Sequence, residues 1–427
     1  MSAKESIPYV TRIVEPRYNR SGFQSQFELP DDTAFYSDMR LAGVGFSSAS
    51  GATLYNGLLG AEAPIQKMSL LDGGTVIEQV DFQNWRPMQK VNTDNDSNIS
   101  MQRYLSHNSL GFIAEGRVDL RGQGNYGGDQ QTDVALAPVD SVNTTDATSQ
   151  QAWISLKEVF GFLRSMSIVP TNVFKQMRVV IEYSTSTKLV ADNAKTDLQT
   201  TPPVLFADEL LASDVKRTAM STFQGIRYTA VEHDSFLLPV IDGMTDVAGN
   251  RTIERTVTTQ LKAFNGKYIR DLILKFSPTN AQTTGGGANK LYGQLGSQAT
   301  YGRNIQVRVN GVDTLPQGGA RGSMRQLAMT TDTMGTLNLL WSQYTIGPQD
   351  TNELGASLGE TIAEMSPFAC DVESSIEDLQ LIITRSGVFG NPDLNDPIRV
   401  DCFARIPKSI VVTRDGRYAV LYDSTEF

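Results

Sequence analysis

Histidine and cysteine are scarce in this chain of 427 residues, which has only two of each. Two histidines, His107 and His233, cannot form a multi-histidine metal site. Two cysteines, Cys370 and Cys402, allow at most one disulfide and no structural zinc site. Neither histidine lies near a Gly-x-Ser-x-Gly elbow or a cysteine nucleophile, so we expect structural histidines and buried free thiols. The sequence therefore predicts no catalytic, metal-binding or cofactor-binding residue.

An excess of basic residues is also missing. The chain has 37 Lys and Arg against 47 Asp and Glu, a net charge of -10, whereas a protein that coats nucleic acid needs a basic surface. The first 20 residues contain no apolar run of the kind that a secretory signal has. The uncharged stretch 41–61 is too rich in glycine for a membrane-spanning helix. We therefore expect no secretion signal and no direct sequence-specific binding of nucleic acid.

Alternation of apolar and polar residues with period two is the clearest pattern that is present. It places one face of a strand in a core and the other in solvent, as antiparallel sheets do. The four strongest examples are Gln176–Ser184, Thr252–Ala263, Asn304–Val312 and Glu377–Arg385. Further strands are predicted at Arg40–Ser47, Thr75–Phe82, Phe112–Leu120, Phe223–Val231, Tyr268–Phe276 and Ile398–Ile406. Asp415-Gly416 predicts a tight hairpin turn near residue 415.

Helical signals are few and short. A capping box at Ser155-x-x-Glu158 predicts one helix, and two more are expected after Ser323 and over Pro203–Arg217. Two long polar loops, Gly122–Gln150 and Thr279–Gly302, connect predicted strands, one in each half of the chain. The pattern predicts a mainly β protein with helices as insertions and a weak internal duplication of architecture.

Two short motifs resemble ligand-binding motifs but lack features that those sites need. Gly122-x-Gly124-x-x-Gly127 matches the dinucleotide fingerprint, but no amphipathic helix follows to hold a pyrophosphate, which favours a loop. Asp94-x-Asp96-x-Asn98 begins like a calcium loop. Its sixth and twelfth positions, Ile99 and Leu105, lack the required glycine and glutamate. We interpret it as a polar turn.

Charge is unevenly distributed along the chain. Residues 326–384 contain nine acidic residues and no Lys or Arg, which is typical of a solvated acidic face or of a surface that meets a basic partner or a neighbouring subunit. The first 20 residues carry Lys4, Arg12, Arg17 and Arg20. They predict either an arm that docks onto another component or an ordinary terminal tail.

Three segments resemble the double jelly-roll major capsid proteins of icosahedral DNA viruses, of the virophage and polinton-like type. These are SLLDGGTVIEQVDFQNW, MQRYLSHNSLGF and EVFGFLRSMSIVPTNVFKQMRVVIEY. They lie within Ala63–Ser184, and the second half is similar only in the order of its strands and the placement of its loops. The resemblance implies two consecutive jelly-roll domains, an antiparallel β-sandwich each: an N-terminal arm at 1–35, a first roll at 36–203 and a second roll at 204–427.

The same resemblance implies a structural role in the virion. Such a protein forms a homotrimer of pseudo-hexagonal outline that tiles an icosahedral shell with neighbouring capsomers, penton and minor capsid proteins, in some cases over an internal membrane. Two other classes stay open: another virion protein or a carbohydrate- or receptor-binding two-domain β-sandwich protein, and a β-fold glycoside hydrolase with two carboxylates. The tryptophans, Trp85, Trp153 and Trp341, are scattered, which favours packing over a carbohydrate site.

Overall fold

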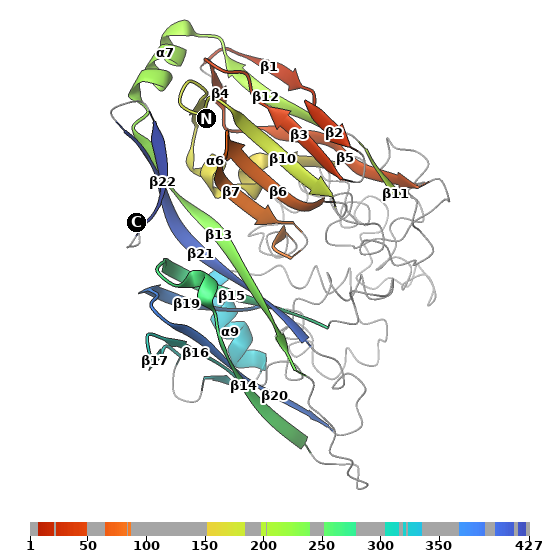
Figure 1. The fold of residues 1–427 in the computed structure, drawn as a ribbon, viewed down its shortest axis with the longest axis vertical. Helices are drawn as coiled ribbons and strands as arrows, with labels where there is room; N and C mark the ends of the chain where they lie inside the picture. The colour runs from red at the N-terminus through yellow and green to blue at the C-terminus, as the bar shows by residue number, and fades with distance from the viewer. Residues whose placement is uncertain are drawn as a thin grey trace.

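The fold is mainly β in a computed structural model of the chain (Figure 1). The structure describes residues 7–20, 23–48, 65–82, 84–86, 152–183, 198–201, 203–239, 252–278, 304–315, 319–321, 323–334, 367–388, 398–413 and 417–423. Its strands form four antiparallel sheets. Two sheets precede helix α7 (Ser213–Thr222) and two follow it, so each half is a sandwich. The prediction of two consecutive β-sandwiches is confirmed.

The first sandwich packs a seven-stranded sheet on a five-stranded one. The larger sheet has the order β11-β5-β12-β4-β9, with β1 beside β12 and β8 beside β5. Its strands are β1 (Tyr9–Val14), β4 (Ala34–Tyr36), β5 (Arg40–Ser48), β8 (Ala152–Ser155), β9 (Ile168–Pro170), β11 (Leu198–Thr201) and β12 (Val204–Leu210). The smaller sheet has the order β2-β3-β10-β6-β7, from β2 (Tyr18–Arg20), β3 (Gln24–Glu28), β6 (Ile65–Asp72), β7 (Thr75–Asp81) and β10 (Met177–Tyr183).

The second sandwich pairs two five-stranded sheets. One has the order β13-β21-β15-β19 with β22 beside β21, from β13 (Gly225–Leu238), β15 (Tyr268–Pro278), β19 (Phe368–Ser375), β21 (Ile398–Val412) and β22 (Tyr418–Tyr422). The other has the order β14-β20-β16-β17 with β18 beside β16, from β14 (Thr252–Gln260), β16 (Asn304–Val309), β17 (Val312–Asp313), β18 (Ala320–Arg321) and β20 (Leu379–Val388). The long strands β13 and β21 lie toward the first sandwich (Figure 1).

The described helices are short and lie outside the sheets. Besides α7 they are α5 (Leu156–Val159), α6 (Gly161–Ser165), the 3₁₀ turn η7 (Lys262–Phe264) and α9 (Ser323–Met334). The helix expected after Ser323 is therefore confirmed. Ser155 precedes α5, but its side chain makes no capping hydrogen bond, and Glu158 pairs with Arg86 instead. The capping box predicted here does not form.

The predicted alternation agrees with the observed burial. In β10, Met177, Val179, Ile181 and Tyr183 are buried while Arg178 and Glu182 are half-buried, and Val180 is the one exception to the alternation because it is buried too. The strands β14, β16 and β20 occupy the other three alternating segments. The hairpin arms β21 and β22 pair antiparallel, with Val412 opposite Tyr418. The turn residues 414–416, the segment Phe112–Leu120 and both long polar loops lie outside the described residues.

The helix predicted over Pro203–Arg217 is wrong in its first half. Val204–Leu210 is the strand β12, and only Ser213–Thr222 is helical. Sheet pairing decides the conformation, because β12 is bordered by β1 on one side and by β5 and β4 on the other. A boundary at residue 203 would cut β12 from its own sheet. The sandwiches divide at α7 instead.

The first 35 residues also differ from the expected arm. β1 pairs with β12 over six residues, and β3 carries the fully buried Phe27 into the core. Arg12 of β1 forms an ion pair with Glu209 of β12, and Thr33 donates to the same carboxylate at 2.6 Å. Strand signals were weak here because every side chain of β1 is exposed or half-buried, so burial imposes no period. These strands belong to the first sandwich.

Candidate site: the seam between the two sandwiches

The central strands of one sheet of the second sandwich are buried on both faces. Along β21, Val400, Cys402 and Ala404 belong to the core of the second sandwich, whereas Phe403 and Ile410 belong to the core of the first. Successive side chains of a strand point to opposite faces, so β21 contributes to both cores at once. We call the contact between this sheet and the first sandwich the seam.

Aromatic side chains interlock across the seam. Phe162 of α6 packs edge-on against Tyr228 of β13, with ring centroids 5.5 Å apart. Trp85 packs on Phe403 at 5.2 Å, and Phe174 on Tyr418 at 5.1 Å. Rings at such spacings contribute packing beyond their buried area. The seam is therefore built like a domain core.

Two tyrosine hydroxyl groups tie the sandwiches together. Tyr228 donates to the carbonyl of Ile77 and Tyr418 to a carboxylate oxygen of Asp72, both at 2.8 Å. The backbones also come very close at Gly161. A Cβ atom there would lie 2.0 Å from the carbonyl oxygen of Thr229. Glycine is thus required where α6 meets β13.

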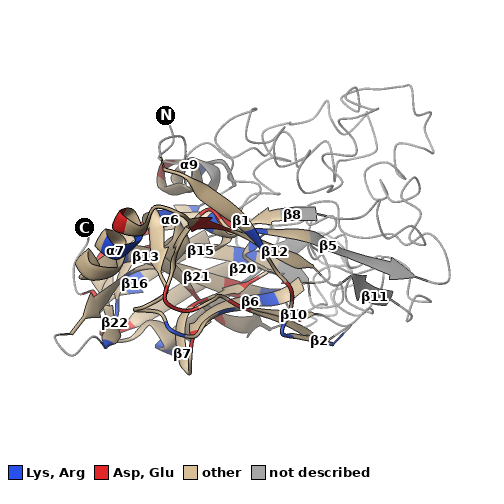
Figure 2. Ribbon diagram, turned by 90° about the horizontal axis from the view of Figure 1, so that it is seen from above, with Lys and Arg blue, Asp and Glu red and all other residues tan. Residues whose placement is uncertain are grey.

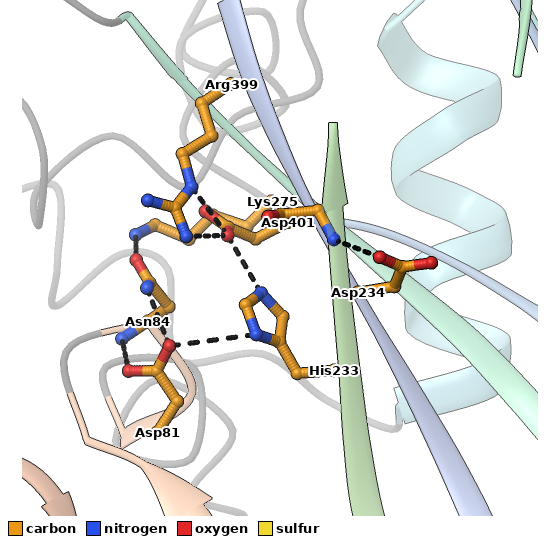
Figure 3. A network of polar contacts seen from close by, with 8 residues as sticks. Asp81, Asn84, His233, Asp234, Lys275, Arg399 and Asp401 are labelled. Atoms are coloured by element: carbon orange, nitrogen blue, oxygen red, sulfur yellow. Dashed lines mark hydrogen bonds and ion pairs between the residues drawn. The ribbon is translucent and has the colours of Figure 1, made fainter. Parts of the chain in front are cut away.

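A polar network fills one part of the seam (Figure 3). Asp401 of β21 is fully buried, and its Oδ1 lies 2.9 Å from Nε2 of His233 and 2.8 Å from Nη2 of Arg399. Lys275 donates to Oδ1 of Asn84 at 2.9 Å, and Asn84 donates to Asp81 at 2.8 Å. His233 stacks on Phe403 with ring centroids 4.7 Å apart. The network joins β7 and the turn after it to β13, β15 and β21.

The charges in this network compensate one another. Burial would raise the pKa of Asp401, but the hydrogen bond to His233 and the charges of Lys275 and Arg399 hold that pKa below its usual value. Burial lowers the pKa of Lys275 to about 8, against the attraction of Asp401 and Asp81. Buried charges are tolerated when they are paired in this way. The arrangement holds strands of both sandwiches together.

Beside the network lies a cavity of about 560 Å³, bordered by β7, β13 and β21. Two of its carboxyl groups have pKa values displaced in opposite directions: burial raises that of Glu78 to about 7, while bonds from Lys267 and Lys408 outweigh burial and lower that of Glu232. Opposed shifts are a mark of acid–base pairs in glycosidases. Here Glu78 accepts from the backbone of α6, and Glu232 is held by Lys267, Lys408 and Tyr422. Their bonds are structural.

The residues singled out from the sequence are distributed as follows. His233 lies in the seam network, and Cys370 and Cys402 are free and buried, as predicted. His107, the Gly122 fingerprint and the Asp94 motif lie outside the described residues, as does Trp341. Trp85 is buried in the seam, with 7% of its surface exposed, and borders both cavities there. Among the described residues no group of three or more His, Cys, Asp or Glu could hold a metal ion.

The seam was not found from the sequence. His233 and Asp401 are 168 residues apart, and each sits in an ordinary strand pattern. Uninterrupted apolar residues at Leu272–Leu274 and Cys402–Ala404 are the local signal of this burial, because strands buried on both faces lose their alternation.

The outer surface has a second notable feature. Large apolar side chains are exposed at Tyr9, Val10, Ile13, Tyr18 and Phe23, with Ile13 at 63% and Phe23 at 56%. All belong to β1, β2 or the turn before β3. Strand β1 belongs to the larger sheet of the first sandwich and β2 to the smaller one. Acidic and basic residues are interspersed along the described strands (Figure 2).

Neither the described helices nor comparisons of the sequence with known families assign the chain to a class. None of its described helices has both the length and the apolar character needed to cross a membrane. No protein-family model and no curated protein sequence matches the chain.

Solved structures do match it. A PBCV-1 protein fitted into a cryo-EM reconstruction of the virophage Sputnik is 10% identical with a TM-score of 0.58, and the match covers 99% of both chains. The quasi-atomic structure of the PBCV-1 virus capsid is 11% identical with a TM-score of 0.58 and the same coverage. The mavirus major capsid protein is 9% identical with a TM-score of 0.53, over 99% of this chain and 92% of its own. The chain has the double jelly-roll fold.

Proposed function

We propose that the chain is a major capsid protein that assembles as homotrimers into an icosahedral shell. The observation that carries the proposal is the match of the whole fold, both sandwiches included, to chains from virus capsids. A trimer of two-sandwich chains has six similar blocks and a nearly hexagonal outline, which packs edge to edge. Cyclic symmetry closes such a trimer.

The seam supports this role mechanically. A capsid protein that packs edge to edge in a shell has to keep its two sandwiches in a fixed relative orientation. A seam with interlocked aromatic rings, two tyrosine hydrogen bonds and a buried charge network resists sliding and bending more than a small polar interdomain contact does. The wide engagement of β21 in both cores has the same effect.

The surface supports self-association. The exposed apolar side chains of β1 and β2 offer area that a neighbouring capsomer or a minor capsid protein would cover. The net charge of -10 does not favour direct contact with a genome. We infer that other proteins or an internal membrane lie between the shell and the nucleic acid. We also infer that the protein resides in the virion and has no enzymatic activity. Its expected partners are penton and minor capsid proteins.

Oligomeric mass is the direct test. Three chains of 46.7 kDa give about 140 kDa, and light scattering on the purified protein should report that mass. Negative-stain images should show particles with a threefold, nearly hexagonal outline. A monomer that persists across micromolar concentrations would count against the proposal, because obligate capsomer interfaces bury upwards of about 2,000 Å².

A further inference from the structure

The side chains of Lys275 and Asn84 meet in the polar network of the seam (Figure 3). Lys275 belongs to β15 of the second sandwich, and Asn84 lies in the turn after β7 of the first. Alternation along β15 places Lys275 on the same face as Ile273, which packs in the first core, so the lysine side chain points across the seam. Its Nζ is 2.9 Å from Oδ1 of Asn84. An amine and a carboxamide that are 191 positions apart in the sequence are thus in direct contact.

Asp81 fixes the orientation of the Asn84 side chain. Its Oδ2 accepts a hydrogen bond from Nδ2 of Asn84 at 2.8 Å, and its Oδ1 accepts one from the backbone N–H of the same residue at 3.1 Å. A carboxylate only accepts hydrogen bonds, and an ammonium group only donates them. The carboxamide therefore presents its nitrogen to Asp81 and its carbonyl group to Lys275.

The amine of Lys275 is withdrawn from water. The residue is fully buried, and burial lowers its pKa to about 8, so a larger fraction of it is neutral than of an exposed lysine. Asp401, also fully buried, lies directly opposite Lys275 in the β15–β21 pair. Its Oδ1 contacts His233 and Arg399, whereas its Oδ2 has no hydrogen-bond partner in the described part of the chain. The residue beside the lysine thus has a carboxylate oxygen available to accept a proton.

We propose that Lys275 and Asn84 join in an isopeptide bond that ties the two sandwiches together covalently and releases ammonia. Asp401 takes one proton from Lys275, and the lone pair of Nζ forms a bond to Cγ of Asn84 while the carbonyl π pair moves onto Oδ1. Asp81, bonded to Nδ2, relays a second proton from Nζ to Nδ2. The carbonyl group then re-forms, the Cγ–Nδ2 bond breaks, and the departing ammonia takes up the proton held by Asp401. An ammonium group and a carboxamide thereby become a secondary amide and an ammonium ion.

The surroundings favour this reaction. Folding holds the two reacting groups together, which replaces a bimolecular encounter. Trp85, packed on Phe403, follows Asn84 directly and helps to exclude water from the network, which strengthens the action of its carboxyl groups. The cavity of about 560 Å³ borders Asp81 and Asn84 but not Lys275, so ammonia can leave on the side away from the amine. The reaction occurs once in each chain and holds whether or not the chain forms a shell.

Mass spectrometry of the purified, denatured full-length chain is the test. Its mass should be lower by one ammonia than the mass calculated from the sequence. A tryptic digest should contain a branched peptide with both Asn84 and Lys275, because trypsin does not cleave after an acylated lysine. A cyclic imide at an asparagine also loses ammonia, but it leaves cleavage after Lys275 intact. The full calculated mass, or a loss of ammonia without the branched peptide, would overturn the proposal, and this test needs no variant.

Four variants separate the covalent bond from the hydrogen bonds around it. Lys275→Arg and Asn84→Ala each remove one reacting group and should keep the full calculated mass. Lys408→Arg changes another lysine of the seam and should lose ammonia as the wild type does. Asp81→Asn keeps both reacting groups and the shape of the side chain, and should slow the loss of ammonia by roughly 100-fold or more in protein whose circular dichroism matches the wild type.

Two results with these variants would contradict the chemistry. Loss of ammonia from Lys275→Arg at the rate of the wild type would show that the lysine is not the nucleophile. Equal rates for Asp81→Asn and the wild type would refute the proton relay through Asp81.

Discussion

Replacing Gly161 by alanine is the sharpest test of the seam. The new Cβ atom would lie 2.0 Å from the carbonyl oxygen of Thr229, and contacts under 3.0 Å essentially never occur. The partner atom belongs to the backbone of β13, so no flexible side chain can move aside. The two backbones would have to separate by about 1 Å or more, the difference between those two distances.

The expected cost is large for so small a change. Overpacking of a rigid contact destabilises by about 1–3 kcal/mol and at times by more, and we expect the upper end or beyond for Gly161→Ala. Helix propensity acts in the opposite direction, because alanine is favoured over glycine in a helix by up to about 1 kcal/mol. A net loss of stability would therefore come from the contact with Thr229 and not from the helix propensity of residue 161.

Gly74→Ala is the matched control. A Cβ atom at Gly74 meets nothing within 4 Å, so this substitution should stay within about 0.5 kcal/mol of the wild type. Thermal and denaturant unfolding of the two variants, side by side, give the comparison. If Gly161→Ala proved as mild as Gly74→Ala, the sandwiches would not be in backbone contact at α6, and the description of the seam as a close-packed junction would fail.

Three further perturbations address other parts of the fold. Tyr228→Phe leaves the carbonyl of Ile77 without its 2.8 Å donor and should lower the free energy of unfolding by about 1–2 kcal/mol in denaturant titrations; no change would mean that water replaces the hydroxyl. Ile181→Asp places a charge in a fully buried site of β10 and should abolish folding. A short Gly/Ser insertion near Gly286, outside the described residues, should change stability by no more than about 1 kcal/mol. Similar damage from both changes would refute the prediction that Thr279–Gly302 is a polar loop. Deleting residues 1–20 removes β1 and β2 and should lower the soluble yield, because the edge of β12 is uncovered; a well-folded truncated chain would show that β1 contributes little.

Strands with one buried face were predictable, and the others were not. β10, β14, β16 and β20 each lie between core and surface, so their sequences alternate. β12 has buried residues at Ala207, Asp208, Glu209 and Leu210 in succession. Its acids are satisfied by Thr11 and Arg12 of a strand about 200 residues earlier, and no local pattern can show that.

The candidate site was predictable only in its components. The scarcity of histidine and cysteine led to the expectation of structural roles, and Cys370 and Cys402 are indeed buried free thiols. The seam joins residues such as Tyr228 and Ile77, which are 151 positions apart. Its existence depends on how two sandwiches dock, which composition and periodicity do not encode.

The double engagement of β21 has a consequence for synthesis on the ribosome. This strand supplies Phe403 and Ile410 to one core and Val400 and Ala404 to the other. A nascent chain must therefore emerge as far as Val412 before either sandwich can complete its packing. Until then the aromatic side chains of α6 and its neighbours lack their cover, and the growing chain depends on chaperones or on fast completion to avoid aggregation. A chain released early lacks strand β21 and with it part of both cores, so premature termination would not yield a separately folded first sandwich.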